Sequence, residues 1–167
     1  MLSKFKRAKH QQHLAQLPKL PQQVGEVETL FSPAAFRQAL LEAIGQATQR
    51  IYLVALYLEN DDGGRDVLNA LYQAKRQRPQ LEIFVLVDWH RAQRGRIGAE
   101  ASNTNADWYC RMASEYPDVI VPIYGVPVNT REALGVLHLK GFIIDDRVIY
   151  SGASLNDVYL HRHDKYR

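Results

Sequence analysis

The chain has 167 residues, of which 46% are hydrophobic, so it can bury one sizeable core and we expect a single folded domain. Its only cysteine, Cys110, excludes an intrachain disulfide bond and a cysteine-rich metal site. The longest apolar run, residues 51–58, is far shorter than the ~20 residues that a membrane-spanning helix needs. The first twenty residues show no secretory signal. We therefore expect a cytoplasmic protein that meets membranes only at their surface.

Positive charge is concentrated at the start of the chain. The net charge is only +3, but five of the 21 basic residues precede the first acidic residue, Glu26. These five are Lys4, Lys6, Arg7, Lys9 and Lys19. The rest of the chain is slightly acidic, with 16 basic against 18 acidic residues. Residues 1–25 are thus predicted to form a basic arm that suits an anionic partner, either phospholipid head groups or nucleic acid. The alternative is a solvated, flexible tail.

Strands and helices alternate after the arm. The predicted order is a strand over residues 27–31, a helix from Ser32 to about 47, a strand over 51–58, a helix from about 67 to 78 and a strand over 81–87. The first helix is predicted to start at Ser32-Pro33, where a capping hydroxyl precedes a proline at the first helical position. The continuous apolar run 51–58 is typical of a strand buried on both faces.

The second half of the chain continues this pattern. It is predicted to contain a basic loop over residues 89–98, a helix over 105–115, a strand over 119–124 and a hairpin of strands 137–144 and 147–151. The hairpin turns at Asp145-Asp146. This order favours an α/β sandwich that has a mixed sheet with helices on both faces.

The segment from Val136 to Asp145 carries the chemistry. His138 and Lys140 are two apart on the predicted strand, so both side chains project from one face. Such a pair suits a phosphodiester, because lysine neutralises a phosphoryl oxygen while a neutral imidazole attacks phosphorus. This chemistry needs no metal, and we expect neither metal nor cofactor. Without their neighbours, the two residues are more typical of a polar strand edge.

Asp145 ends the predicted strand and admits two interpretations. It can orient or electrostatically support a catalytic group. Equally, Asp-Asp is ordinary chemistry for a hairpin turn. The residue type alone leaves both open.

The full spacing resembles a known signature. His138-x-Lys140-x-x-x-x-Asp145, followed by Gly152-Ala-Ser154-Leu-Asn156, is similar to the motif of the phospholipase D superfamily. This resemblance implies a phospholipase-D-like α/β sandwich. In that superfamily one active site is built from two such motifs, so the chain would be one half of a two-motif pseudo-dimer.

A closer resemblance extends over nearly the whole chain. Residues 86–98, 102–109 and 151–159 look like the bacterial phosphatidylserine synthases, which are CDP-diacylglycerol–serine O-phosphatidyltransferases. This family makes phosphatidylserine and CMP from CDP-diacylglycerol and L-serine in phospholipid (phosphatidylethanolamine) biosynthesis. We therefore expect the same activity, at the cytoplasmic face of the inner membrane, with the basic arm on the anionic lipid surface.

The resemblance also implies roles for individual residues. His138 would attack the phosphorus of CDP-diacylglycerol, expel CMP and hold the phosphatidyl group until the hydroxyl of L-serine displaces it. Lys140 would bind the phosphate, and Asp145 would complete the catalytic motif. Ser154 or Asn156 would donate a hydrogen bond to the phosphate, and the sequence leaves the choice open.

A second group of candidate binding residues lies in the basic loop. Arg91, Arg94 and Arg96 follow Asp88, which stands at the carboxyl end of a predicted strand. Ligands favour this edge of an open α/β sheet. Three guanidinium groups there can hold the CDP pyrophosphate or anionic lipid head groups. The alternative is a solvated basic loop.

No second His-x-Lys motif of this pattern is present in the chain. We therefore expect residues 26–167 to be a truncated N-terminal domain, inactive by itself unless two copies pair. The alternatives are another phospholipase-D-type phosphodiesterase (a phospholipase, a cardiolipin-type synthase or a nuclease) and an inactive lipid-binding fragment. A nuclease is disfavoured, because duplex binding requires a broad basic face and the body of the chain is slightly acidic.

Overall fold

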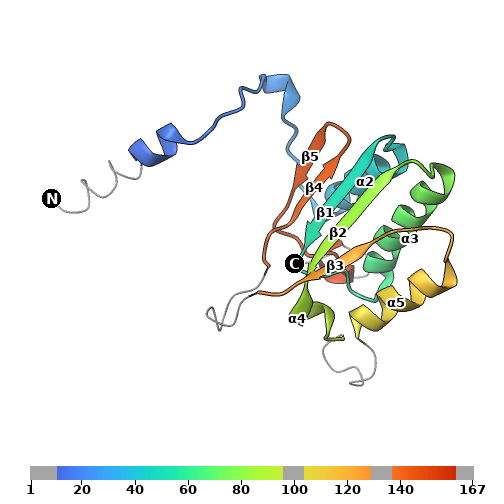
Figure 1. Ribbon diagram of the computed structural model, residues 1–167. Coiled ribbons are helices and arrows are strands. Elements are labelled where there is room, and N and C mark those ends of the chain that lie inside the picture. The colour runs from blue at the N-terminus through green and yellow to red at the C-terminus, as the bar shows by residue number, and fades with distance from the viewer. Residues whose placement is uncertain (1–10, 96–103, 129–136, 161–167) are drawn as a thin grey trace.

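The computed structural model describes residues 11–95, 104–128 and 137–160 (Figure 1). The first ten residues of the predicted arm lie outside this part, and so does Arg96. Within the described residues, no helix is both long enough and apolar enough to cross a membrane.

A five-stranded mixed sheet organises the chain. Its strands are β1 (Arg50–Ala55), β2 (Glu82–Asp88), β3 (Ile123–Val126), β4 (Gly141–Ile144) and β5 (Arg147–Tyr150). Their order across the sheet is β3-β2-β1-β4-β5. The first three strands run parallel, whereas β4 and β5 form an antiparallel hairpin beside β1. The mixed α/β architecture predicted from the sequence is confirmed.

Helices connect the strands and begin at capping residues. Residues 11–16 are helical, and the further helical segments are η1 (Val24–Glu26), α2 (Pro33–Gln46), α3 (Asp62–Gln77), α4 (Trp89–Ala92), α5 (Asn105–Glu115) and α6 (Asp157–Leu160). The Ser32 side chain accepts a hydrogen bond from the Ala35 N–H, as predicted for the start of α2. Thr104 and Asp107 form a capping box at the start of α5.

The core lies on one face of the sheet. Along β1, Ile51, Leu53 and Ala55 are buried, and the alternating Tyr52 points to the other face. The long helices α2, α3 and α5 lie on the buried side of the sheet (Figure 1). Apolar side chains of the helices, such as Leu40, complete this cluster. Burial of this face fixes the strand register, because a slip of one residue would expose it.

The opposite face carries a row of aromatic rings. The ring centroids of Tyr52 and Phe84 lie 5.7 Å apart, and those of Phe84 and Tyr124 lie 6.1 Å apart. Phe84 is 38% exposed and Tyr124 is 49% exposed. We predicted helices on both faces of the sheet. Among the described elements, the longer helices all cover the other face.

Four predicted strands differ from the structure by more than one residue. The strand predicted over 51–58, buried on both faces, ends at Ala55 and is fully buried on one face only. Residues 27–31 are not a strand; Phe31 is 92% exposed, and nothing there offers a strand partner. The strand predicted over 119–124 begins later, at Ile123, because Pro122 has no N–H to donate to a ladder. The strand predicted over 137–144 begins at Gly141, so His138 and Lys140 precede β4.

Candidate active site

His138 and Lys140 form a close pair at the start of β4. The Nζ of Lys140 lies 3.2 Å from Nε2 of His138 and 3.4 Å from the His138 carbonyl oxygen. Lys140 is only 2% exposed, whereas His138 is exposed. The prediction that these side chains lie together is borne out, although they reach this position from an extended segment rather than from a strand.

The environment of Lys140 shapes the chemistry of the pair. Desolvation lowers the pKa of the Lys140 ammonium. An ammonium group has only donors, so its contact with the ring is a hydrogen bond when Nε2 of His138 carries the lone pair. In this tautomer Nε2 is the nucleophilic nitrogen, and its lone pair becomes free for attack on phosphorus when the Lys140 ammonium turns from the ring to a phosphoryl oxygen.

A buried carboxylate holds the segment that carries His138. Asp88, at the end of β2, is fully buried. Its Oδ2 accepts a hydrogen bond from the N–H of Leu137 at 2.9 Å, and its Oδ1 accepts one from the N–H of Arg91 at 2.8 Å. The carbonyl of Lys140 accepts a further bond from the N–H of Ser151 at 3.3 Å. The backbone around the pair is therefore tied to the end of β2 and to Ser151, the residue that follows β5.

Ser154 and Asn156 lie in the buried segment that precedes α6. They are 7% and 9% exposed, respectively. The Asn156 amide donates to the Tyr57 hydroxyl at 3.4 Å, while its Oδ1 accepts from the N–H of Tyr159 at 3.0 Å. Asn156 thus orders α6 with its carbonyl oxygen. Binding of phosphate by either residue stays a prediction.

The predicted arginine cluster is only partly described. The Arg91 guanidinium lies over the ring of Tyr57, 4.8 Å from its centroid, and is half-buried. Arg94 is exposed just beyond α4. Arg96 lies outside the described residues. Of the two arginines that are described, Arg91 has its guanidinium stacked on another side chain, whereas Arg94 is exposed.

Asp145 does not join this cluster. Its carboxylate accepts hydrogen bonds from the backbone N–H groups of Thr48, Gln49 and Arg50, at 2.8 to 3.0 Å, and from the Thr48 hydroxyl at 3.1 Å. The four residues of β4 separate it from Lys140, a span of about 16 Å at the rise of a strand. Its contacts support the structural interpretation, in which it anchors the hairpin to the start of β1.

The hydrogen bonds at Asp145 also set its ionisation. Desolvation raises the pKa of this carboxyl, but bonds from Arg50, Thr48 and Gln49 outweigh that effect and lower it to about 2. Asp145 has φ of 50°, a left-handed conformation that Asp tolerates in turns.

Two residues that no sequence pattern singles out lie around Arg91. The Arg91 guanidinium stacks on the ring of Tyr57, and its charge acts on the carboxyl of Glu59. Tyr57 belongs to the apolar run of residues 51–58, and Glu59 has no motif around it. Among the described residues, no group of three or more His, Cys, Asp or Glu side chains is arranged to hold a metal ion.

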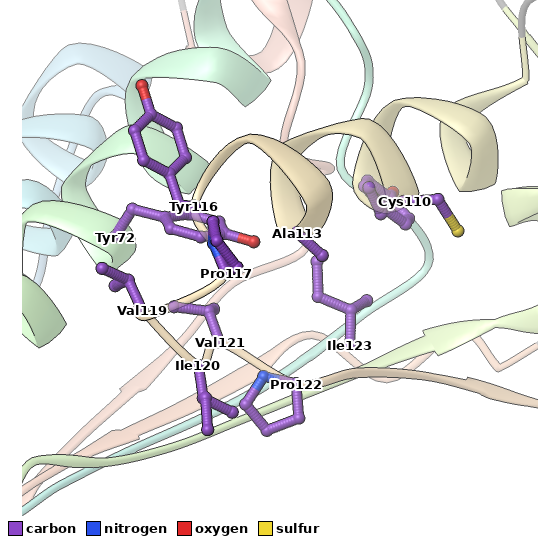
Figure 2. Close-up of a pocket in the computed structure, with 11 residues that line it drawn as sticks. Tyr72, Cys110, Ala113, Tyr116, Pro117, Val119, Ile120, Val121, Pro122 and Ile123 are labelled. Carbon is purple, nitrogen blue, oxygen red and sulfur yellow. The ribbon is translucent and has the colours of Figure 1, made fainter.

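A separate apolar cavity of about 290 Å³ lies between α3, α5 and the segment before β3 (Figure 2). Tyr72, Tyr116, Val119 and Ile120 are among its walls. None of its lining residues is a predicted site residue. The cavity therefore does not bear on the His138–Lys140 pair.

Comparison with known proteins confirms the resemblance inferred from the sequence. No protein-family model matches the chain. The crystal structure of phosphatidylserine synthase from Haemophilus influenzae superposes with a TM-score of 0.87 and 48% identity, covering 97% of this chain and 36% of that one. NucT from Helicobacter pylori shares the fold, with a TM-score of 0.53 and 14% identity over 78% of this chain and 74% of its own. The fold class is therefore that of this solved phosphatidylserine synthase, a mixed α/β sheet with helices.

Within this class, the chain resembles the CDP-diacylglycerol–serine O-phosphatidyltransferases. It is 76% identical to that of Escherichia coli, over 100% of this chain and 37% of the relative. It is 50% identical to that of Haemophilus influenzae over the same shares. A CDP-diacylglycerol–glycerol-3-phosphate 3-phosphatidyltransferase of Schizosaccharomyces pombe is 28% identical over 89% of this chain and 31% of its own. The chain thus spans little more than a third of the length of the two serine enzymes and slightly less than a third of the length of the Schizosaccharomyces pombe relative.

Proposed function

We propose that the chain supplies one half-site of a CDP-diacylglycerol–serine O-phosphatidyltransferase. The observation that carries the proposal is the 3.2 Å approach of Lys140 Nζ to His138 Nε2, in a chain 76% identical to an enzyme of that name. Residues 26–167 form the phospholipase-D-like domain, and residues 1–25 form its basic arm.

In the first step, Nε2 of His138 attacks the phosphorus that bears the diacylglycerol. A nitrogen–phosphorus bond forms, the phosphoanhydride bond breaks, and CMP leaves with the electron pair. Lys140 stays beside the reacting phosphoryl group, where its charge is only weakly screened because it is 2% exposed. Ser154 and Asn156 serve as candidate donors to the same group.

In the second step, the hydroxyl of L-serine attacks the phosphatidyl–histidine intermediate. The oxygen–phosphorus bond forms, His138 is released, and the hydroxyl proton passes to a base. A second histidine motif supplies this acid–base function in the superfamily. It comes here either from the remainder of a longer chain or from a second copy, since the described half-site presents a single His–Lys pair.

The lipid substrate requires contact with a membrane surface. Leu14 and Leu17, in the described part of the arm, are 59% and 45% exposed, and Leu20 is 86% exposed. Exposed leucines near a run of basic residues suit insertion between anionic head groups. We propose peripheral attachment at the cytoplasmic face of the inner membrane through residues 1–25.

One alternative acceptor has a specific observation in its favour. The relative from Schizosaccharomyces pombe, 28% identical, is named for transfer to glycerol 3-phosphate from the same lipid donor. This second candidate keeps the His138 chemistry and changes only the acceptor. The much higher identity to the serine enzymes favours serine.

CMP release from CDP-diacylglycerol in detergent micelles, with L-serine, glycerol 3-phosphate or neither, tests the proposal. The full-length gene product is expected to release CMP in a serine-dependent manner, and His138→Ala is expected to abolish it. His90→Ala is the matched control, because His90 is exposed and contacts only the edge of Trp89. CMP release that depends on glycerol 3-phosphate instead of L-serine would show that glycerol 3-phosphate is the acceptor. CMP release by His138→Ala would show that His138 is not the nucleophile.

A further inference from the structure

Glu59 is a carboxylate whose bonding is incomplete. It follows β1, and its N–H donates to the carbonyl of Leu155 at 3.1 Å. The side chain is half-buried, and its Oε1 is shielded from solvent without a hydrogen-bond partner. Desolvation raises the pKa of this carboxyl, and a hydrogen bond with Asn105 opposes the rise. A carboxylate in this setting gains from a cationic group that would satisfy it.

Arg91 is a cationic side chain in the same region, and its hydrogen bonding is also incomplete. Its guanidinium stacks on Tyr57, and its Nε is buried with no hydrogen-bond partner. The charge of Arg91 acts on Glu59 and lowers the pKa of that carboxyl, so the two groups are near enough to interact. Each nevertheless keeps one buried polar atom without a hydrogen-bond partner, and both residues are only partly buried.

Asp88 links Arg91 to the segment that carries His138. The N–H of Arg91 and the N–H of Leu137, the residue before His138, donate hydrogen bonds to the two oxygens of the Asp88 carboxylate. Tyr57, on which Arg91 stacks, accepts a hydrogen bond from Asn156, one of the candidate phosphate donors. Glu59 and Arg91 therefore belong to the same end of the sheet as the candidate nucleophile.

We propose that Glu59 and Arg91 form the subsite for the acceptor amino acid, with Glu59 binding its ammonium and Arg91 its carboxylate. The inference rests on the proposed function and names the acceptor's recognition groups. A zwitterion satisfies one anion and one cation at once, and the guanidinium fork matches a carboxylate. An alcohol without these charges leaves both side chains unpaired, which a buried polar site penalises strongly. The assignment places Arg91 at the acceptor rather than at the CDP pyrophosphate.

The test separates the two steps of the reaction in the full-length gene product. Exchange of labelled CMP into CDP-diacylglycerol reports only the step at His138 and needs no serine. In Glu59→Gln, the KM for L-serine is expected to rise at least about tenfold, as loss of one charged partner implies, while CMP exchange falls by less than about threefold. Glu115→Gln, an exposed glutamate at the end of α5, is the matched control.

Competing ligands identify which charge is recognised. Glycerate lacks the ammonium of serine, and ethanolamine lacks its carboxylate. Wild-type protein is expected to discriminate against both as inhibitors of serine transfer, whereas Glu59→Gln is expected to lose its discrimination against glycerate only. An unchanged serine KM in Glu59→Gln, or a parallel loss of CMP exchange, overturns the subsite.

Failure of the proposed function gives a different result. A wild-type protein that neither releases nor exchanges CMP defeats the transferase assignment, whatever happens at Glu59. Calorimetric titration with L-serine then tests the subsite by itself. Binding that is weakened in Glu59→Gln supports it, and the absence of binding to the wild type overturns it.

Discussion

Asp88 accepts a hydrogen bond from the backbone N–H of Leu137 at 2.9 Å, and thereby fixes the residue that precedes His138. The same fully buried carboxylate caps α4 through the N–H of Arg91. One side chain therefore holds the backbone beside the proposed nucleophile and that of the proposed acceptor-binding arginine. Asp88 is a positioning residue, since it acts through the two backbone segments that it joins.

Replacement of Asp88 by Asn is expected to lower kcat more than it changes KM. The amide keeps one oxygen but turns an NH₂ group toward one of the two N–H donors, which displaces that segment. A displacement of about 1 Å at a reacting group can cost about 100-fold in rate, so we expect a loss of kcat between about 10- and 100-fold. Steady-state kinetics on the full-length gene product provide the measurement.

The control for this variant is Asp118→Asn, at an exposed position outside the helices and strands. If the melting temperature of Asp88→Asn is close to that of the wild type, its loss of kcat comes from displaced active-site segments and not from unfolding. Unchanged kcat in Asp88→Asn, or a loss that follows the melting temperature, would contradict the positioning role.

The elements that sequence predicted well are those with strong local signals. The apolar, β-rich run of residues 51–58 predicted the strand that forms over Arg50–Ala55, although it is fully buried on one face only. Ser32-Pro33 predicted a helix start because capping is a local interaction. The spacing of His138 and Lys140 brought their side chains together even though the strand begins only at Gly141. Two residues of extended chain share a face whether or not they pair in a sheet.

The features that sequence missed depend on contacts across the fold. Asp145 is bonded to Thr48, Gln49 and Arg50, about 95 positions earlier, and no local pattern reveals such a partner. Glu59 and Tyr57 acquire their surroundings from α4 and from the segment before α6, which are distant in sequence. The predicted motif grouped Asp145 with His138 by spacing, and the structure separates them because β4 lies between.

Replacement of Lys140 by Met is expected to abolish CMP release and yet stabilise the fold. Burial of the ammonium carries a desolvation cost, which its lowered pKa reflects. An apolar side chain of similar length removes that cost, and we expect a gain of about 1 kcal/mol in the free energy of unfolding. Urea denaturation at neutral pH measures the gain, and Lys75→Met, which removes two hydrogen bonds to carbonyl oxygens, should destabilise instead.

The effect of Lys140 on stability is expected to depend on pH. The unfolded chain binds this proton more tightly than the folded chain, so the free energy of unfolding rises with pH from the lowered pKa up to the ordinary value. The difference between the wild type and Lys140→Met should therefore shrink in alkaline buffer. A difference that is constant across this range would contradict the desolvation argument.

Replacement of Tyr109 by Phe is expected to destabilise the fold by about 3 kcal/mol. The buried hydroxyl donates to the carbonyl of Leu58 at 2.6 Å and accepts from its N–H at 3.0 Å. Its loss leaves two buried backbone groups unsatisfied, at about 1–3 kcal/mol each. Tyr150→Phe, at a side chain that is 76% exposed, should change stability by less than about 0.5 kcal/mol. Equal effects of the two variants in thermal denaturation would refute the role of Tyr109.

Replacement of Asp145 by Asn is expected to lower stability without a selective effect on the chemistry of His138. In the folded chain the pKa of Asp145 is about 2, whereas in the unfolded chain it is about 3.9. Between these pH values the folded chain keeps the carboxylate charged while the unfolded chain binds a proton. The stabilisation is therefore complete above about pH 4 and is lost as the pH falls toward 2. After allowance for solvent screening, it amounts to about 1 kcal/mol.

The neighbouring aspartate offers a matched control for this prediction. Asp146 has a side chain that is 96% exposed and makes only a 3.5 Å contact with Arg50. Asp146→Asn should leave the acid denaturation profile unchanged, whereas Asp145→Asn should flatten it between about pH 4 and pH 2. CMP exchange by Asp145→Asn should fall only in proportion to its folded fraction. A larger fall in CMP exchange, at a pH where the variant is fully folded, would contradict the structural role. It would show that Asp145 supports the step at His138, because loss of a hairpin anchor alone is not expected to slow that step in folded protein.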